Sequence, residues 1–425
     1  MDSVALGVEK ISNSENEMKR VLIHTLIFSP DGVSTAYLYN DIALKLKERD
    51  YEVVVLTTTP HFNIVEEQLK EQPMKWKVWG LCKVSKFHGM TVLHVPQKKF
   101  KSTLLRLLGF VYWHIVSFFI GLTIRHVDLI LSPSPPLTIG FLNLGLARLK
   151  GCKVVYNVQE IYPDILKMRE GLPLKLLRWM ERKVYNGSDA VTTIDQVFHD
   201  TIVDRFTDRR KLHIIPNFVD TELYHQYECR GVLDGKTFPD DDKIKVLYAG
   251  NIGFAQDWDP LLELAEQTQD VNAEYVIIGE GVRKTYLEEE SRRRGLQNVR
   301  ILPYQPRQLM PYILSYSDLN FIFMSPKMEG DGFPSKVYTI MACERPLLVV
   351  SGENTPIVNF LQGKGCAKLI TNRSVAEMVS WMHRVNREEL RAMGRNGLKT
   401  IQENYTKEIV TGMYADLAKE LIGEA

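Results

Sequence analysis

Residues 321–342 combine side chains that suit a phosphorylated, polyhydroxylated ligand. An apolar run typical of a buried strand is followed by a loop that contains the acids Glu329 and Asp331. Two glycines in the same loop, Gly330 and Gly332, allow the backbone to approach a ligand closely. We expect the loop acids to face the hydroxyl groups of a sugar.

The helix expected after this loop supplies positive charge. Its first turn contains Ser335 and Lys336. Free N–H groups and the positive end of the dipole at a helix N-terminus attract phosphate, and a lysine adds a mobile cation. We therefore expect Lys336 and this helix N-terminus to bind the phosphate groups of the ligand.

Strands alternate with helices along most of the chain. Apolar and β-branched runs predict strands at 21–28, 51–58, 91–96, 128–132, 153–158, 213–215, 243–249, 275–278, 299–302, 319–324 and 346–350. Amphipathic spacing predicts helices at 35–49, 138–150, 173–185, 258–266, 374–385, 387–404 and 408–422. The alternation is typical of doubly wound α/β domains, and after residue 350 we expect mainly helices.

The 425 residues suffice for two domains, each with its own core. We place the first domain at 1–220 and the second at 221–405, with the C-terminal helix 406–425 as a candidate addition to the first. The polar segment 227–242 has little periodicity, and we expect it to be the interdomain linker.

Composition excludes several classes of protein. The 53 basic and 52 acidic residues nearly balance, which argues against a nucleic-acid partner. The five cysteines are scattered and form no CxxC pair, which favours a reducing compartment and argues against a zinc site. The N-terminal segment 1–17 is polar and lacks the pattern of a signal peptide, so we expect a cytoplasmic protein.

Further candidate residues lie where other predicted strands end. Loops at the carboxyl ends of parallel strands line the ligand crevice of an open sheet. In the first domain these loops contain Gly32, Ser34, Glu160 and Asp164. Gly32 is equally compatible with a plain turn, and loop acids are usually only solvated. The second domain repeats the arrangement in loops 250–253, 279–281, 303–305 and 325–335.

One apolar segment of the first domain, 104–124, follows the basic run of Lys98, Lys99, Phe100 and Lys101. Its length approaches that of a membrane span. A span would place the preceding and following strands on opposite sides of the bilayer, so two other interpretations compete with it. One is a buried crossover helix, and the other is a helix whose outer face lies in the membrane surface. The preceding lysines favour the interfacial helix.

Motifs spread over almost the whole chain occur in a characteristic order. They are the loops 30–35 and 57–62, SPSPPLT at 132–138, VQEIYPD at 158–164, IPNFVD at 215–220, YAGNIG at 248–253, the glycines of 279–281 and PSKVYTIMA at 334–342. This set resembles the retaining glycosyltransferases of family 4 with the GT-B fold, and among them the sugar transferases of bacterial O-antigen, capsule and exopolysaccharide assembly. The resemblance implies two Rossmann-like domains that face a central cleft.

The same resemblance implies the reaction. A hexosyl or N-acetylhexosaminyl group would pass from a nucleotide-sugar, which we expect to be a UDP-sugar, to a lipid-linked saccharide or another glycan. With an interfacial helix at 104–124, the acceptor would be a polyprenyl-diphosphate-linked glycan at the cytoplasmic membrane surface. No DxD-type motif follows a suitable strand, so we expect catalysis without a metal ion.

The resemblance also assigns residues. It places the catalytic residues at Asp331 and Glu160. The donor-binding residues are Gly250, Asn251, Gly253, Gln256, Tyr304, Gly332, Phe333, Ser335, Lys336 and Thr339. The residues on the acceptor side or lining the cleft are Gly32, Ser34, His61 and Asp164. A core or surface position is the alternative for His61.

The chain departs from the family pattern at two places. Thr339 stands where the family has a second acid that binds the nucleotide ribose, and a threonine can bond a hydroxyl but carries no charge. Asn251 and the residues after it stand where many relatives carry arginine and lysine, so Lys336 becomes the main candidate for binding the diphosphate. Glu329 is an alternative to Asp331 as the acid near the transferred sugar.

Two other functions fit the same donor site. A GT-B-fold nucleotide-sugar epimerase would use the same cleft but would require acid and base residues beside the sugar. A non-catalytic sugar-nucleotide sensor would tolerate the loss of the second acid. The SPSPPLT and PSK motifs favour the transferase over the epimerase.

Overall fold

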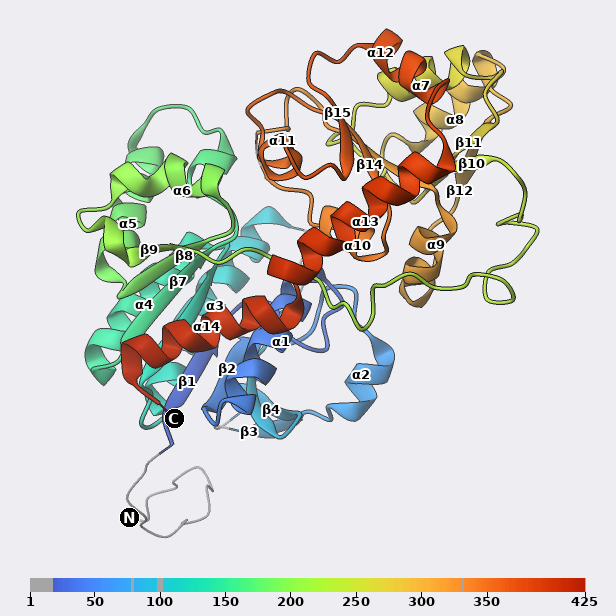
Figure 1. Ribbon diagram of the computed structural model, residues 1–425. Helices are drawn as coiled ribbons and strands as arrows, with labels where there is room; N and C mark the ends of the chain where they lie inside the picture. Colours follow the sequence, from blue (N-terminus) through green and yellow to red (C-terminus); the bar gives the residue numbers. More distant parts are fainter. Residues whose placement is uncertain (1–17, 78–79, 98–101, 331, 425) are drawn as a thin grey trace, which may run out of the picture. The chain divides into compact units, whose positions relative to one another are not determined.

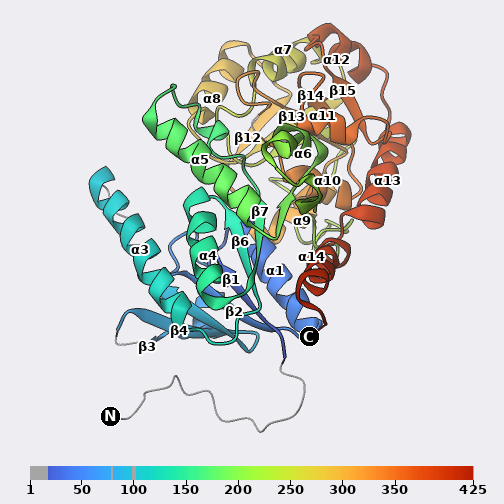
Figure 2. The ribbon, with the colours of Figure 1, turned by 90° about the vertical axis from the view of Figure 1, so that its left-hand side faces the viewer.

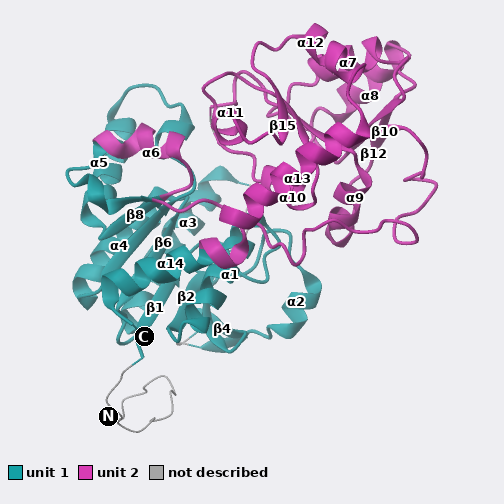
Figure 3. Cartoon of the chain, viewed as in Figure 1, with its two compact units in different colours: residues 1–192, 205–213, 411–425 teal, residues 193–204, 214–410 magenta. Residues whose placement is uncertain are grey.

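The computed structural model describes residues 18–77, 80–97, 102–330 and 332–424 (Figure 1). The chain forms two units, each with one sheet and its own helices. Unit 1 comprises residues 1–192, 205–213 and 411–425, and unit 2 comprises residues 193–204 and 214–410 (Figure 3). The prediction of an α/β protein with two doubly wound domains is confirmed.

The sheet of unit 1 has nine strands in the order β3-β4-β5-β2-β1-β6-β7-β8-β9. Their bounds are β1 Arg20–His24, β2 Glu52–Thr58, β3 Lys75–Lys77, β4 Cys82–Phe87, β5 Met90–Val95, β6 Leu129–Ser134, β7 Lys153–Val158, β8 Ala190–Thr193 and β9 Leu212–Ile214. The strands β5, β2, β1, β6 and β7 run parallel, whereas β4 pairs antiparallel with both β3 and β5. The chain leaves β1 toward β2 and later returns to β6 on the other side, which makes the edge between β1 and β6 a topological switch point.

Helices cover this sheet. They are α1 Ser34–Glu48, α2 Glu66–Glu71, α3 Thr103–Thr123, α4 Leu137–Lys150 and α5 Leu172–Gly187. The next helix along the chain, α6 Gln196–Ile202, belongs to unit 2. The helix α3 packs on α4 through its second half, where a Cβ on Gly121 would lie 2.8 Å from Leu146. Its first turns stand clear of α4 (Figure 2), and Leu104, Leu107 and Leu108 are exposed there.

The last helix of the chain, α14 Lys407–Ile422, completes unit 1 from residue 411 onward (Figure 3). The fully buried side chain of Asn157 is one of the contacts that hold it. The Asn157 Oδ1 atom accepts a hydrogen bond from the hydroxyl of Tyr39 at 2.5 Å, and its Nδ2 atom donates to the hydroxyls of Thr192 and Tyr414, each at 2.8 Å. Four elements distant in sequence therefore share one buried polar group, and each bond depends on the others.

The sheet of unit 2 has six strands in the order β12-β11-β10-β13-β14-β15, all parallel. Their bounds are β10 Ile244–Ala249, β11 Ala273–Ile278, β12 Val299–Leu302, β13 Leu319–Phe323, β14 Leu347–Val350 and β15 Ala367–Ile370. The helices are α7 Asp259–Gln267, α8 Lys284–Arg293, α9 Met310–Tyr316, α10 Lys336–Ala342, α11 Pro356–Leu361, α12 Val375–Met382 and α13 Arg387–Asn404. The four central strands β10, β11, β13 and β14 are buried on both faces, which explains their continuous apolar runs.

The expectation of a linker at 227–242 is wrong. This segment lies on unit 2, where Leu233 and Phe238 are buried in the core. The hydroxyl of Tyr316 donates to the carbonyl of Pro239 at 3.0 Å and fixes the backbone there. Two buried side chains in a polar stretch produce no periodic pattern, so the sequence resembles a linker although the segment is packed.

Several short elements escaped the sequence analysis. The strands β3, β4 and β8 were not expected, and β15 lies in the part of the chain where mainly helices were expected. The edge strand β3 is three residues long, all of them exposed, and β15 has only one buried residue, so neither carries the apolar signal of a central strand.

The replacement Tyr414→Phe tests the role of Asn157. It removes the buried hydroxyl that accepts a hydrogen bond from Nδ2 of Asn157, so we expect unit 1 to lose about 1–2 kcal/mol of stability. Hydrogen exchange at the amides of β7 would measure this as faster opening. The control Tyr304→Phe removes an exposed hydroxyl and should leave the exchange unchanged. Equal exchange in both variants would show that α14 is not held by this contact.

Candidate functional site

The candidate donor site lies at a topological switch point of unit 2. The strands β10 and β13 are parallel neighbours, and the chain continues from β10 to one side of the sheet and from β13 to the other. Ligands of open α/β sheets bind at the carboxyl ends of strands at such a point. The loops that begin at Gly250 and Met324 follow these two strands, so the sheet topology itself brings the YAGNIG and PSK motifs together.

Lys336, the first residue of α10, lies against the end of β10. Its Nζ atom donates to the carbonyl oxygen of Ala249 at 3.1 Å and lies 3.9 Å from the centre of the Tyr248 ring. A Cβ atom on Gly250 would lie 2.6 Å from the same Nζ, and Gly250 has a φ of +150°. A glycine is therefore required at position 250 for the Lys336 ammonium group to reach the strand end.

Burial governs the charge of Lys336. Loss of hydration lowers the pKa of the ammonium group to about 8. Among the residues that the structure describes, no carboxylate forms an ion pair with it, and Asp331 lies outside them. The positive charge of Lys336 is thus stabilised only by the carbonyl of Ala249 and the ring of Tyr248 among these residues. An anionic ligand would supply the missing charge.

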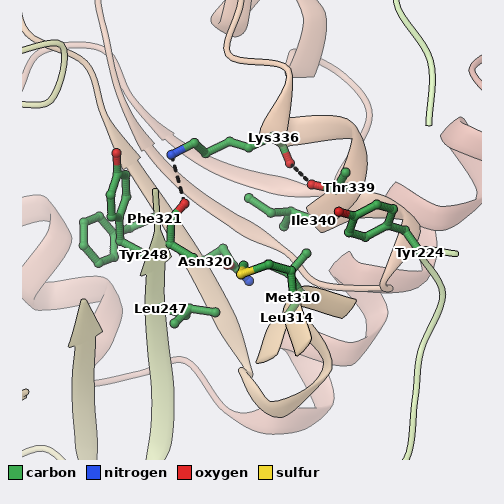
Figure 4. Close-up of a pocket in the computed structure, with 11 residues that line it drawn as sticks. Tyr224, Leu247, Tyr248, Met310, Leu314, Asn320, Phe321, Lys336, Thr339 and Ile340 are labelled. Atoms are coloured by element: carbon green, nitrogen blue, oxygen red, sulfur yellow. Dashed lines mark hydrogen bonds between the residues drawn. The ribbon is translucent and has the colours of Figure 1, made fainter. Parts of the chain in front are cut away.

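A small cavity of about 80 Å³ lies beside Lys336. It is lined by side chains of β10, β13, α9 and α10, including Leu247, Tyr248, Met310, Asn320, Phe321, Thr339 and Ile340 (Figure 4). The Thr339 hydroxyl donates to the carbonyl of Lys336 at 2.9 Å, so its hydrogen bond goes to its own helix. The cavity is far smaller than a pocket for a small-molecule ligand. The cavity by itself is therefore too small to hold a nucleotide.

Glu329 is engaged in an ion pair that fastens the loop after β13. Its Oε2 atom accepts hydrogen bonds from the Arg373 guanidinium and, at 2.8 Å, from the backbone N–H of Gly352. Arg373 also lies 3.5 Å from Asp257 and donates to the carbonyl of Met324 at 3.0 Å. Glu329 therefore anchors the loop, which does not favour it as the alternative acid near the sugar. Asp331 remains the predicted one.

The predicted donor residues near β10 divide into two groups. Asn251 and Gly253 are held through their backbone. The carbonyl of Asn251 accepts a hydrogen bond from the Tyr248 hydroxyl at 2.8 Å, and the carbonyl of Gly253 accepts one from the Trp258 indole at 3.0 Å. Gln256 is buried, and its side-chain oxygen accepts from the N–H of Phe323 at 3.1 Å. The structure thus uses the side chain of Gln256 to join the two loops.

The remaining predicted donor residues are less closely grouped. Tyr304 is 67% exposed after β12, and Ser335 precedes α10 without capping it. The Phe333 ring packs against Tyr338 at 5.1 Å and Phe360 at 4.9 Å, which fixes the backbone just after Gly332. Phe333 therefore contributes to the core that supports the loop.

In unit 1, the loop after β1 is fastened to the loop after β2. The buried carboxylate of Asp31 accepts from the backbone N–H groups of His61 at 2.8 Å and Phe62 at 2.7 Å. The N–H of Gly32 donates to the carbonyl of Asn63, and a Cβ on Gly32 would lie 2.3 Å from that oxygen. Gly32 is thus required for the close approach of the loop after β1 to the loop after β2. Asp31 was missed as a site residue, although an acid before a glycine at a strand end is a signal for such a bond.

His61 is oriented by its neighbours. Its Nδ1 atom lies 2.8 Å from the carbonyl oxygen of Thr59, which assigns the proton to Nδ1 and leaves Nε2 as an acceptor. Ser34 begins α1 and is exposed, close in sequence to the loop that Asp31 fastens.

The two acids after β7 differ in their environment. Glu160 is half-buried, and burial raises the pKa of its carboxyl group. Asp164 forms an ion pair with Arg205 at 2.5 Å, and Arg205 also bonds the buried Glu181. Asp164 is therefore part of a structural ion-pair cluster, whereas Glu160 retains a carboxylate suited to bind or deprotonate a hydroxyl.

The replacement Lys336→Met should stabilise unit 2 at neutral pH. The folded-state pKa of about 8 lies below the ordinary lysine value, so the folded protein is penalised for the charge at pH 7. This penalty disappears as the pH rises through 8 toward the unfolded value. Urea denaturation should show a higher free energy of unfolding for Lys336→Met than for the unmodified protein at pH 7, and this difference should shrink by pH 10. A gain independent of pH would contradict a buried charge.

Two curated relatives and a solved structure resemble the chain. It is 25% identical over 341 residues to the putative colanic acid biosynthesis glycosyl transferase WcaI of Escherichia coli (strain K12), covering 76% of this chain and 81% of WcaI. It is 22% identical over 323 residues to the probable glycosyltransferase WbjE of Pseudomonas aeruginosa, covering 71% and 76%. The crystal structure of Anabaena Alr3699/HepE in complex with UDP and glucose superimposes with a TM-score of 0.68 at 12% identity, covering 95% of this chain and all of HepE.

Family models match both units. A model of Glycosyltransferase Family 4 matches residues 36–223, and a model of the Glycosyl transferases group 1 matches residues 232–365. These matches follow the order of motifs along the chain, and the structural likeness covers both sheets. The chain is a glycosyltransferase of the GT-B fold and belongs to family 4.

Proposed function

We propose that this glycosyltransferase moves a sugar from a UDP-sugar to a polyprenyl-diphosphate-linked saccharide during cell-surface polysaccharide synthesis, with retention of the anomeric configuration. The observation that carries the proposal is the position of Lys336, a half-buried cation at the strand end where a diphosphate would lie. The names of WcaI, a colanic acid transferase, and of HepE in complex with UDP and glucose support the pathway and the donor.

The chemistry assigned to the chain is mainly electrostatic. The bond between the anomeric carbon and the diphosphate oxygen breaks, the acceptor oxygen bonds to that carbon, and the hydroxyl proton leaves the acceptor. Negative charge grows on the departing UDP, and the Lys336 ammonium group stabilises it. Asp331 would lie near the transferred sugar, and the carboxylate of Glu160, whose raised pKa suits proton transfer, would accept the proton that leaves the acceptor hydroxyl.

Thr339 is proposed to contact the ribose of the nucleotide. Its hydroxyl bonds its own helix but keeps lone pairs that can accept a bond from a ribose hydroxyl. A neutral partner weakens this contact relative to an acid. Binding of the nucleotide then depends more strongly on Lys336, and no metal ion is assigned to the diphosphate.

The helix α3 supports a membrane-surface acceptor. It is long and apolar enough to cross a bilayer by length and composition, and most of its surface is exposed. The strands before and after it, β5 and β6, belong to one sheet, so α3 cannot span a bilayer without separating them. An interfacial position on the cytoplasmic side places the exposed face in the headgroup region. The basic run 98–101 lies outside the described residues.

One experiment separates transferase, epimerase and sensor. The protein is incubated with UDP- and GDP-sugars, with and without membrane lipid extract, and nucleotide release and donor isomerisation are followed. We expect UDP release only when lipid is present. Isomerised donor without lipid would support the epimerase, and tight binding without turnover would support the sensor.

The replacement Asp331→Ala should lower transfer by at least a hundredfold, because Asp331 is the acid proposed to lie at the sugar. Its affinity for UDP, which lacks the sugar, should remain within about twofold of the unmodified protein. Glu329→Gln is the comparison, since it alters a loop anchor and should reduce thermal stability instead. Near-normal turnover of Asp331→Ala would remove Asp331 from the mechanism.

The affinity for UDP should fall as the pH rises through about 8. Below that pH Lys336 is protonated and attracts the diphosphate, and above it the free protein loses this charge. Calorimetric titration between pH 6.5 and about 9.5 would measure the change, with proton uptake on binding near pH 8. Lys336→Met should bind weakly at every pH, and a pH-dependent affinity in that variant would assign the titration to another group.

A further inference from the structure

Unit 1 contains an open groove of about 540 Å³ between α3 and the β3–β4 hairpin. One wall is formed by the first turns of α3, through Leu105, Leu108 and Gly109. The opposite wall is formed by Trp76 and Lys83. The volume is in the range of small-molecule sites, and most of the lining is apolar.

The floor of the groove lies at the carboxyl edge of the sheet. Thr59 and Gln97 line it, directly after β2 and β5. The Thr59 hydroxyl accepts from the N–H of Gln97 at 3.0 Å, and the Thr59 carbonyl lies 2.8 Å from Nδ1 of His61. The inner end of the groove therefore lies next to His61, whose backbone N–H is bonded to Asp31.

The hairpin wall is basic. The Lys83 ammonium group lies 5.1 Å from the centre of the Trp76 ring, and these two residues are cross-strand partners on the face that lines the groove. Lys75 and Lys77 alternate with Trp76 along β3 and lie on the other face of the hairpin. In the described part of the chain, Lys83 forms no ion pair with a carboxylate. The hairpin side of the groove thus carries a cation, while the α3 side is apolar.

We propose that this groove binds the isoprene units nearest the diphosphate of the acceptor lipid, and that Lys83 binds the diphosphate. The inference rests on the proposed function. A polyprenyl diphosphate joins an apolar chain directly to a strong anion, which matches an apolar wall that faces the ammonium group of Lys83. Bulk phospholipid needs only the exposed face of α3, whereas the groove reaches inward to Thr59 and Gln97.

The rest of the chain would leave along the exposed face of α3. Leu104, Leu107 and Val111 continue the apolar surface beyond the groove. Figure 2 shows that this part of the helix stands clear of α4, so a chain can pass from it into a membrane surface. The groove thereby selects one lipid and presents its glycan toward the strand ends.

Photo-crosslinking tests the assignment. The probe is a benzophenone-bearing farnesyl diphosphate in neutral phosphatidylcholine vesicles, and the labelled peptides are mapped by mass spectrometry. We expect labelling of the β3–β4 hairpin and the first turns of α3. The replacement Gly109→Leu fills the groove while favouring the helix, and it should reduce labelling at least tenfold.

Two matched controls accompany the probe. Gly145→Leu places the same side chain on an exposed position of α4, where a Cβ contacts only Phe118 at 3.8 Å, and should label normally. Lys83→Glu should also lose labelling, whereas Lys86→Glu, an exposed lysine of the same strand, should not. Equal labelling of Gly109→Leu and Gly145→Leu, or full displacement of the probe by phosphatidylglycerol vesicles, would overturn the proposal.

Turnover separates this inference from the proposed function. With lipid extract as acceptor, Gly109→Leu should raise KM at least tenfold with little change in kcat. Unchanged KM in an active enzyme would refute the groove and leave the transferase intact. Absence of any turnover in the unmodified protein, together with groove labelling, would refute the transferase and leave a polyprenyl diphosphate site.

Discussion

The contact between the Lys336 ammonium group and the carbonyl of Ala249 organises the second unit. It joins the first helical turn after β13 to the end of β10, and it exists only because position 250 has no side chain. An ammonium group in such a place is poorly hydrated, and burial lowers its pKa. The sheet topology creates the position, the glycine opens it, and the charge makes it useful for an anion.

The loop that carries the predicted sugar acid is held from several directions. Arg373 and Glu329 tie its first half to the loops after β14 and β15, and Phe333 ties its second half to an aromatic cluster. The backbone on both sides of Asp331 is therefore fixed by hydrogen bonds and ring packing within unit 2. Such support is typical of a binding loop whose reactive group must keep its position.

The central strands were predictable because their apolar runs are continuous, and β7, β12 and α13 have the predicted bounds. Lys336 was predictable as a candidate because it follows a glycine-rich strand end. The roles of Gln256 and Glu329 were not, because their partners Phe323 and Arg373 lie 67 and 44 positions away. Single-sequence patterns report neighbours along a strand or helix, whereas these side chains are explained by contacts that only the fold creates.

The participation of the C-terminal helix in unit 1 has a consequence for synthesis. Tyr39 and Asn157 are synthesised before most of unit 2, but their partner Tyr414 lies 257 positions after Asn157 and follows all of unit 2. Unit 2 is almost entirely one continuous stretch, 214–410, and can close before that. Unit 1, which precedes unit 2 along the sequence, is thus completed after it, which reverses the usual order of folding during translation.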